Sequence, residues 1–246
     1  MQLTTSGIVI RERRLDEEDR VLTLLTRDRG VITAYHKGYP SRRNYQAALE
    51  LLSYSDFVLF YNKERYSINK ADSNTIFFGI RQDMEKLALA TYFAQLCWEL
   101  APAEEDGAEY LRLMLNTLYL LEKGRRPAGQ LKAILELRMM TMAGYMPDLV
   151  GCAGCGAYEK DEMYFSFSKG DLLCSDCRQD GEYRRRLAPG VLAAMRHILY
   201  SQFEKLFSFT LPAEGLRQLG ETVEQYLVCQ LDRSIPSLDF YHSITT

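Results

Sequence analysis

Residues 151–178 decide the fold of this chain, because positions 152–155 read Cys-Ala-Gly-Cys and positions 174–177 read Cys-Ser-Asp-Cys. The two Cys-x-x-Cys pairs are separated by eighteen residues, a spacing typical of one zinc site with four thiolate ligands. The predicted ligands are Cys152, Cys155, Cys174 and Cys177. Because four protein ligands leave no position for water or substrate, we expect one structural zinc ion per chain.

The residues around the cysteines indicate how the two pairs meet. Residues 163–167 alternate like a strand, and residues 169–171 (Lys-Gly-Asp) can form the turn that returns the chain toward Cys174. Gly154 and Gly156 supply the positive-φ freedom that a tight metal knuckle needs. A redox dithiol, disulfides or four unrelated thiols are the alternatives, although a thioredoxin-like motif would need one pair beside a βαβ pattern.

Composition sets the outer limits. The chain of 246 residues is 47% hydrophobic and 26% charged, which predicts a globular protein with one large domain or a few small ones. The N-terminus lacks a basic segment followed by an apolar run, and no run of eighteen apolar residues occurs, so we expect a cytoplasmic protein without a membrane segment. The net charge of −3 argues against a uniformly basic nucleic-acid binder, yet residues 1–43 contain nine Lys or Arg against six Asp or Glu.

The first part of the chain is predicted to form a small β-barrel. Strand-like runs occupy residues 7–10, 20–26, 31–37, 49–61 and 66–71. Five short strands in succession favour an OB-type barrel over residues 1–78, in which the long fourth run pairs on both sides and removes exposed edges. The loop over residues 38–45 is rich in turn formers and cations and can follow a phosphate backbone, or it is simply a solvated loop.

Beyond residue 74 the apolar period becomes helical. Helices are predicted to begin near residues 84, 106, 127, 189 and 212. The fold class is therefore α+β, with an OB-type barrel followed by an all-α domain over residues 79–150 and 179–246. The zinc module, residues 151–178, interrupts that helical domain. The tail, residues 236–246, is expected to be only partly ordered.

Catalytic motifs are missing from the sequence. There is no Walker-type phosphate loop, no dinucleotide-binding glycine fingerprint and no Gly-x-Ser-x-Gly elbow. The three histidines, His36, His197 and His242, are scattered, and the acidic run at residues 16–19 is expected to decorate a solvated hairpin. Nothing in these patterns requires an enzyme.

Two blocks of sequence, one within residues 7–38 and one within residues 136–177, resemble the bacterial RecO family of recombination mediator proteins. The first block resembles the opening of these proteins and comprises residues 7–10, 18–30 and 34–38. The second block is similar to that family's helix-to-zinc segment, in the same order, and comprises residues 136–138, 144–149, 152–156, 165–166 and 172–177. The resemblance implies an N-terminal OB domain, a helical domain and a zinc module.

The resemblance also implies a non-enzymatic role in recombinational DNA repair. Such a protein binds and anneals single-stranded and double-stranded DNA in the nucleoid and, with RecR, displaces single-strand-binding protein so that RecA can load. Annealing needs sequence-independent attachment to phosphates by Arg and Lys, with aromatic faces available for base stacking. The expected DNA-binding residues are Arg14, Arg20, Lys37, Arg42, Arg43, Tyr35 and Tyr39. Fold support is the alternative role for these side chains.

Contact with single-strand-binding protein carries its own structural requirement. The tail of that protein is acidic and ends in apolar residues, so its receptor must offer an apolar groove with cations at the rim. The expected partner-binding residues lie around the central helices and are Lys123, Arg125, Arg126, Lys132 and Arg138. Solvated helix ends explain the same charges equally well.

Two other functional classes remain open from the sequence. The first is an OB-and-zinc module that binds RNA or ribosomal components, which a comparison of DNA with RNA of the same sequence would distinguish. The second is a metal-dependent hydrolase, which would need an open coordination position on the zinc ion.

Overall fold

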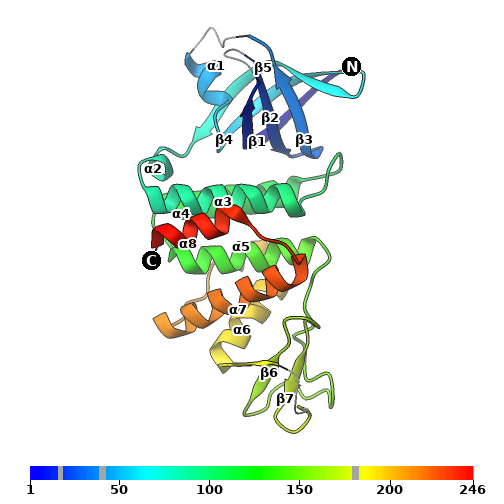
Figure 1. Ribbon diagram of the computed structural model, residues 1–246, viewed down its shortest axis with the longest axis vertical. Helices are drawn as coiled ribbons and strands as arrows, with labels where there is room; N and C mark the ends of the chain where they lie inside the picture. Colours follow the sequence, from blue (N-terminus) through cyan, green and yellow to red (C-terminus); the bar gives the residue numbers. More distant parts are fainter. Residues whose placement is uncertain (16–18, 39–42, 179–182, 246) are drawn as a thin grey trace. The chain divides into compact units, whose positions relative to one another are not determined.

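The computed structural model describes residues 1–15, 19–38, 43–178 and 183–245 (Figure 1). The chain forms two compact units. Unit 1 comprises Met1–Arg125 with Ile235–Thr246, and unit 2 comprises Arg126–Ser234. Within the described residues, no helix is both long enough and apolar enough to cross a bilayer.

Unit 1 begins with a closed five-stranded barrel, as predicted. Its elements are β1 (Gln2–Arg14), β2 (Arg20–Thr26), β3 (Gly30–His36), α1 (Arg43–Ala48), β4 (Ser53–Asn62) and β5 (Arg65–Ile76). The strand order is β1-β2-β3-β5-β4, with β3 and β5 parallel and the other pairs antiparallel. Closure leaves no sheet edge exposed, which removes the usual template for edge-to-edge aggregation.

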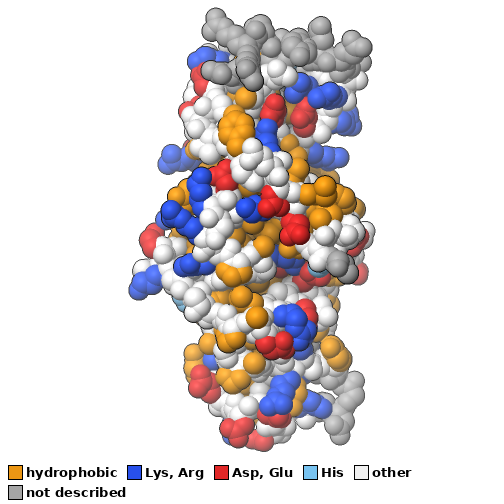
Figure 2. All heavy atoms as spheres, turned by 90° about the vertical axis from the view of Figure 1, so that its left-hand side faces the viewer, with side chains coloured by type: hydrophobic (Ala, Val, Ile, Leu, Met, Phe, Trp, Pro, Cys, Tyr) orange, Lys and Arg blue, Asp and Glu red, His pale blue; other side chains and the backbone are white. Residues whose placement is uncertain are grey.

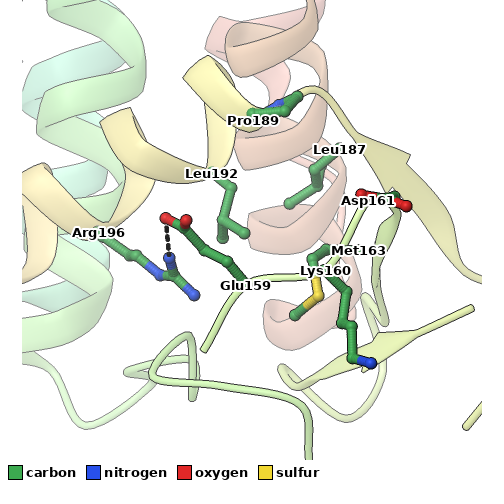
Figure 3. Close-up of a pocket in the computed structure, with 8 residues that line it drawn as sticks. All are labelled: Glu159, Lys160, Asp161, Met163, Leu187, Pro189, Leu192 and Arg196. Carbon is green, nitrogen blue, oxygen red and sulfur yellow. Dashed lines mark ion pairs between the residues drawn. The ribbon is translucent and has the colours of Figure 1, made fainter. Parts of the chain in front are cut away.

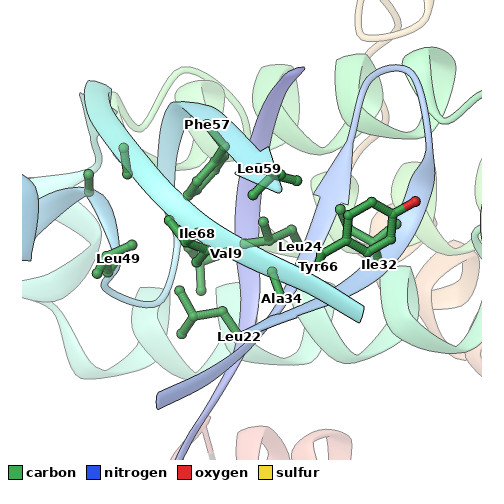
Figure 4. Close-up of a cluster of buried hydrophobic side chains, with 12 residues drawn as sticks. Val9, Leu22, Leu24, Ile32, Ala34, Leu49, Phe57, Leu59, Tyr66 and Ile68 are labelled. Carbon is green, nitrogen blue, oxygen red and sulfur yellow. The ribbon is translucent and has the colours of Figure 1, made fainter. Parts of the chain in front are cut away.

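The barrel core follows from the alternation of apolar residues along the strands. Leu22 and Leu24 of β2 and Phe57 and Leu59 of β4 are fully buried inside the barrel, together with Val9 of β1 (Figure 4). Because successive side chains in a strand point to opposite faces, the residues between these positions face outward. The outer face of the barrel is therefore free to carry polar and charged groups.

One predicted strand is wrong at its beginning. Residues 49–61 were expected to form a single strand, whereas the structure has α1 over Arg43–Ala48 and starts β4 only at Ser53. Ala48 and Leu49 belong to the barrel core and are fully buried. Residues 49–52 form neither a strand nor a helix: they make the turn between α1 and β4, where Leu52 has φ of 63°.

Four helices complete unit 1. They are α2 (Phe78–Arg81), α3 (Met84–Leu100), α4 (Ala108–Glu122) and α8 (Pro236–Thr245). Leu89, Phe93 and Leu96 of α3 are fully buried, as its nearly all-round apolar pattern predicts. The expectation that residues 236–246 are only partly ordered is wrong for the described part of the tail, because α8 packs against α3 and buries Leu238.

The barrel is attached to these helices through a close approach of two backbones. The Val31 amide donates a hydrogen bond to the Pro102 carbonyl at 2.8 Å, and the Gly107 amide donates to the Arg27 carbonyl at 2.9 Å. A Cβ atom on Gly107 would lie 2.6 Å from the Cα of Gly30. Gly30 and Gly107 therefore both have to be glycine, because no side chain fits between the two backbone segments.

In its described residues, 126–178 and 183–234, unit 2 has three α-helices and a small sheet. Its elements are α5 (Ala128–Met142), β6 (Met163–Phe165), β7 (Leu172–Cys174), β8 (Arg185–Leu187), α6 (Pro189–Tyr200), the 3₁₀ turn η1 (Phe203–Lys205) and α7 (Ala213–Leu231). Helices α5, α6 and α7 pack on one another, and the sheet has the order β7-β6-β8. The compact units thus group α2, α3, α4 and α8 with the barrel, whereas the sequence-based division placed all helices in one domain.

We expect Gly30→Ala to destabilise unit 1 by about 3 kcal/mol, because Gly30 has φ of 53° and its new Cβ would lie 2.1 Å from the Pro102 carbonyl oxygen. Urea unfolding followed by tryptophan fluorescence measures the change. Gly124→Ala is the matched control, since Gly124 has φ of 60° but no atom within 4 Å of the added Cβ. Its cost should be about 1 kcal/mol. If Gly30→Ala and Gly124→Ala lost the same free energy of unfolding, the proposed backbone clash at Gly30 would be contradicted.

Candidate metal centre and nucleic-acid interface

The four predicted cysteines come together in unit 2. Their sulfur atoms all lie within 4.8 Å of one another, and the sulfurs of Cys155 and Cys174 are 3.8 Å apart. A tetrahedral ion with Zn–S bonds of about 2.3 Å would place its ligand sulfurs roughly 3.8 Å apart. The cluster is therefore compatible with zinc, and Cys152, Cys155, Cys174 and Cys177 are the residues that would hold the ion.

Backbone geometry explains why the thiols converge. Cys174 ends strand β7, and Cys152 forms a bridge to Leu172 of the same strand. Gly156 has φ of 73°, as the predicted knuckle requires. Gly154 acts differently from the prediction: a Cβ there would lie 2.9 Å from the Cys177 sulfur, so glycine is needed for close approach.

Hydrogen bonds within the cluster distribute protons unevenly among the thiols. Burial opposes ionisation of Cys152, but hydrogen bonds from backbone amides of Cys174, Cys155 and Gly154 outweigh it and lower the pKa of the Cys152 thiol to about 6. Hydrogen bonds with Cys174, Cys155 and Cys152 raise the pKa of Cys177 to about 12. A bound divalent cation would favour the thiolate form of all four.

A cavity of about 470 Å³ lies within unit 2 at the predicted zinc module, residues 151–178. Met163, Leu187 and Leu192 supply its apolar lining (Figure 3). Arg196 of α6 also lines it and faces Glu159 across 3.9 Å. The same guanidinium donates to the carbonyls of Leu149 and Tyr158, each at 2.7 Å, and its burial follows from these bonds.

Arg196 therefore ties the start of the metal module to α6. Its guanidinium also lies 3.9 Å from the centre of the Tyr158 ring. Sequence reasoning missed this residue, because its partners are carbonyl groups about forty residues away and leave no trace in the local pattern.

On unit 1, cations and one tyrosine gather on the outside of the barrel. We call this set, Arg13, Tyr35, Lys37, Lys63 and Arg65, the outer barrel surface. The strand register aligns Arg13 with Val21, Val21 with Tyr35, and Tyr35 with Ser67, and directly opposite residues share a face. Arg65 lies with its guanidinium carbon 5.7 Å from the centre of the Tyr35 ring.

The basic charge is local rather than general. On the face shown in Figure 2, Lys and Arg side chains alternate with Asp and Glu and do not form one uniform positive field. The net charge of −3 agrees with this distribution. Positive charge on this face is thus divided among small groups rather than spread over one large patch.

The predicted DNA-binding residues divide into accessible and buried ones. Arg14 is 72% exposed in its side chain, and Lys37 is exposed, so both can reach a phosphate. The choice of Arg20 is corrected, since its side chain is 8% exposed and pairs with Glu12 at 3.1 Å. Burial, followed by the charge of Arg20, lowers the pKa of His36, so this histidine adds no positive charge at neutral pH. Tyr39 and Arg42 and the side chain of Arg43 lie outside the described residues.

The predicted partner-binding cations also fall into buried and exposed ones. Lys132 is corrected: its side chain is 5% exposed, and its ammonium contacts the carboxylates of Glu136 and Glu224, each at 2.6 Å. Burial disfavours the charged form, but the two carboxylates outweigh burial and raise the pKa of Lys132. This lysine stabilises unit 2 and is inaccessible to a partner.

The other four partner candidates are placed differently. Arg126 donates to the Phe207 carbonyl at 2.7 Å, and Arg138 donates to the Leu199 carbonyl at 2.6 Å, so both brace unit 2. Lys123 and Arg125 are exposed and belong to unit 1. Arg125 lies 5.4 Å from the ring centre of Tyr119.

Comparison with known proteins agrees with this architecture. The family description "Recombination protein O N terminal" matches residues 1–77, and "Recombination protein O C terminal" matches residues 81–239. The "DNA repair protein RecO" of Acetivibrio thermocellus is 34% identical over 243 residues, which is 98% of this chain and 97% of that protein. The chain belongs to the RecO family of DNA repair proteins.

Other relatives of this RecO-family protein have the same name. The "DNA repair protein RecO" of Alkaliphilus metalliredigens is 28% identical over 236 residues and covers 95% of each chain. That of Rubrobacter xylanophilus is 33% identical over 195 residues and covers 78% of each chain. The sequence-based assignment to the family is thereby confirmed, as is the fold class of barrel, helices and four-cysteine cluster.

We expect the purified RecO-family protein to contain about one zinc ion per chain when it is prepared with reductant and without chelator, as metal analysis will measure. Cys174→Ser should lose the ion and expose residues 151–178 to protease, because metal binding stabilises the folded module. Cys229→Ser is the matched control, since Cys229 is exposed on α7 and outside the cluster. Wild-type protein with far less than one zinc per chain, or unchanged zinc in Cys174→Ser, would contradict this assignment.

Proposed function

We propose that this RecO-family protein is a non-enzymatic recombination mediator that binds DNA strands and anneals them. The outer barrel surface is the observation that carries the proposal. Its exposed cations attach to phosphates of any sequence through counterion release, and Tyr35 offers a ring on which a base can stack. The strand order β1-β2-β3-β5-β4 with α1 between β3 and β4 supports the comparison with OB barrels, which bind oligonucleotides on the faces of strands 2 and 3 and on the loop between strands 4 and 5.

Annealing requires weak, uniform attachment rather than base recognition. Two strands held by their phosphates keep their pairing edges free, and neutralised phosphates repel each other less. Arg65 and Lys63 lie at the β4–β5 turn, and Lys37 follows β3, so these cations reach the DNA from neighbouring loops. The proposal includes single-stranded and double-stranded DNA as ligands.

The mediator role extends the proposal to proteins. With RecR, the protein would displace single-strand-binding protein from DNA, which lets RecA load during recombinational repair in the cytoplasm and at the nucleoid. Support comes from the family membership and from the exposed cations Lys123 and Arg125 beside Tyr119, which is 42% exposed. A cation beside an apolar ring suits an acidic tail that ends in apolar residues.

The metal ion has a structural role in this proposal. One zinc ion held by four cysteines leaves no position for a water molecule, which argues against a metal-dependent hydrolase. The ion would instead stabilise a segment whose two strands, β6 and β7, have only three residues each.

Two measurements test whether the outer barrel surface binds DNA: the rate of strand annealing, and the salt dependence of the affinity for single-stranded DNA. We expect Arg65→Glu and Lys37→Glu each to slow annealing and to lower the salt slope by about 0.7, the contribution of one phosphate contact. Lys70→Glu is the matched control, because Lys70 lies on the same strand as Arg65, is exposed and pairs with Asp72. Equal effects of Lys70→Glu and Arg65→Glu would contradict the outer barrel surface. Tighter binding to RNA of the same sequence would favour an RNA-binding module.

The proposed contact with single-strand-binding protein is tested with a fluorescent peptide that has an acidic sequence and an apolar C-terminal residue. We expect binding at low salt by the full chain, weaker binding by Arg125→Glu because one rim cation is lost, and no binding after deletion of the terminal apolar residue. Lys205→Glu, an exposed charge reversal in unit 2, is the control. Unchanged peptide affinity in Arg125→Glu and in Lys123→Glu would move the contact elsewhere.

A further inference from the structure

The only tryptophan of the chain, Trp98, lies on the surface of unit 1. It belongs to α3, whose neighbouring residues Leu96 and Cys97 are fully buried, yet Trp98 itself is 44% exposed. A large aromatic residue gains most by burial, so its exposure on an otherwise buried helix needs an explanation. The packing of α3 within unit 1 does not provide one.

An arginine from the barrel accompanies this tryptophan. The guanidinium carbon of Arg11 lies 4.6 Å from the centre of the Trp98 ring. Arg11 is exposed, and the two residues come from β1 and α3. Stacking orients the guanidinium beside the indole, so a charged donor and an aromatic face are presented together.

A cavity of about 260 Å³ lies at this pair. It is lined by Ile10, Arg11, Thr91, Gln95, Trp98 and Ser237. The lining contains no Asp or Glu, so an anionic group meets no like charge there. The volume is below the range of about 300–1,000 Å³ that drug-sized ligands occupy, which suits one flat ring rather than a larger molecule.

The backbone of β1 places the barrel side of the cavity. The pairing of β1 with β2 shifts between Val9 and Arg11, so Ile10 is an extra residue in the strand. Val9 belongs to the barrel core, whereas Ile10 and Arg11 line the cavity. A bulge of this kind reorients side chains, and here it turns two consecutive residues toward α3.

The other side of the cavity is held by α8. Gln95 accepts hydrogen bonds at its Oε1 from the Ser237 amide at 3.3 Å and from the Ser237 hydroxyl at 2.5 Å. These bonds fix the orientation of the Gln95 amide at the cavity. The cavity is thus assembled from three elements before any ligand arrives.

We propose that this cavity, the Trp98 cavity, receives one unpaired base of single-stranded nucleic acid, which stacks on the exposed indole. Arg11 would contact the phosphate of the same nucleotide. The proposal rests on the proposed DNA-binding function and adds a second contact region beside the outer barrel surface. Stacking on an aromatic face tolerates every base, as strand annealing requires.

The position along β1 connects the two regions. Arg11 aligns with Thr23, Arg13 aligns with Val21, and Val21 aligns with Tyr35. Residues two apart on a strand share a face and lie about 7 Å from each other. A strand held at Arg13 and Tyr35 can therefore continue past Arg11 to Trp98 without leaving the surface of unit 1.

Trp98 supplies its own reporter, since no other tryptophan contributes to the emission. Oligothymidylate is added to the full-length protein, and binding is followed in parallel by anisotropy of a labelled strand. We expect the fluorescence of Trp98 to be quenched in step with the anisotropy. An oligonucleotide of equal length with abasic sites keeps the phosphates and should bind with little quenching, because stacking needs a base.

Substitutions at Trp98 distinguish a loss of base stacking from a loss of folding. Trp98→Ala should weaken oligothymidylate binding about 5- to 150-fold, and Trp98→Phe should restore most of the affinity. Phe78→Ala, an exposed aromatic on α2 outside the Trp98 cavity, is the matched control and should bind like wild type. Circular dichroism and urea unfolding confirm that Trp98→Ala is folded.

The outcomes distinguish this proposal from the one on which it rests. Normal oligothymidylate binding with unchanged Trp98 fluorescence and unchanged affinity of Trp98→Ala overturns the Trp98 cavity and leaves the outer barrel surface intact. Absence of any DNA binding by anisotropy overturns both. Quenching by an acidic peptide with an apolar end, but not by oligothymidylate, assigns the cavity to a protein partner and overturns the nucleic-acid assignment.

Discussion

Unit 1 depends on a contact that involves no side chain. Gly30 and Gly107 bring the end of the barrel against the backbone that connects α3 and α4, and hydrogen bonds from Val31 and Gly107 join the two segments. Backbone groups in contact leave neither freedom to slide nor room for substitution. The barrel is therefore an integral part of a larger core, and surface groups from β1, α3 and α8 can form one cavity because their spacing is set by this contact.

In unit 2 the four-cysteine segment, residues 151–178, is under a different constraint. Its two strands have only three residues each, and its thiols converge on turns that depend on Gly154 and Gly156, a donor set that fits a metal ion. Contacts with α7 support it: Gln230 donates to the Phe167 carbonyl at 2.7 Å, and Tyr226 donates to the Tyr145 carbonyl at 3.0 Å. Arg196 adds the link to α6. The segment is thereby held at its beginning by α6 and at Phe167 by α7, two helices that have their own packing.

Local patterns predicted much of this structure. The spacing of the four cysteines, the alternation in the barrel strands and the proline-initiated helices depend on neighbours in sequence, and all of them appear in the structure. Residues 49–52 were assigned to a strand because a short apolar run does not reveal that the chain turns there, and the preceding helix α1 was not predicted. Helix α8 was missed because it is stabilised by packing on α3 rather than by its own sequence.

Charged residues were the hardest to place from sequence. Arg20 and Lys132 read as surface cations, but each meets carboxylates that only the folded chain brings close: Glu12 from the neighbouring strand, and Glu224 from α7. Arg65 escaped attention for the same reason, because the parallel pairing of β3 with β5 that brings it to Tyr35 joins segments about thirty residues apart. A sequence shows which residues can carry charge, whereas their accessibility is a property of the tertiary structure.

The return of α8 to α3 has a consequence for how the chain is made. Residues 235–246 complete unit 1, but they follow the whole of unit 2 in the chain, so the ribosome delivers them after more than a hundred intervening residues. The barrel and α2 to α4 can associate early, while the surface of α3 that α8 covers stays open until residues 235–246 have been made. During this interval unit 1 exposes apolar groups that the finished protein hides, among them the neighbours of Leu238. Nascent chains stalled within unit 2 would therefore be better substrates for chaperones than the released protein.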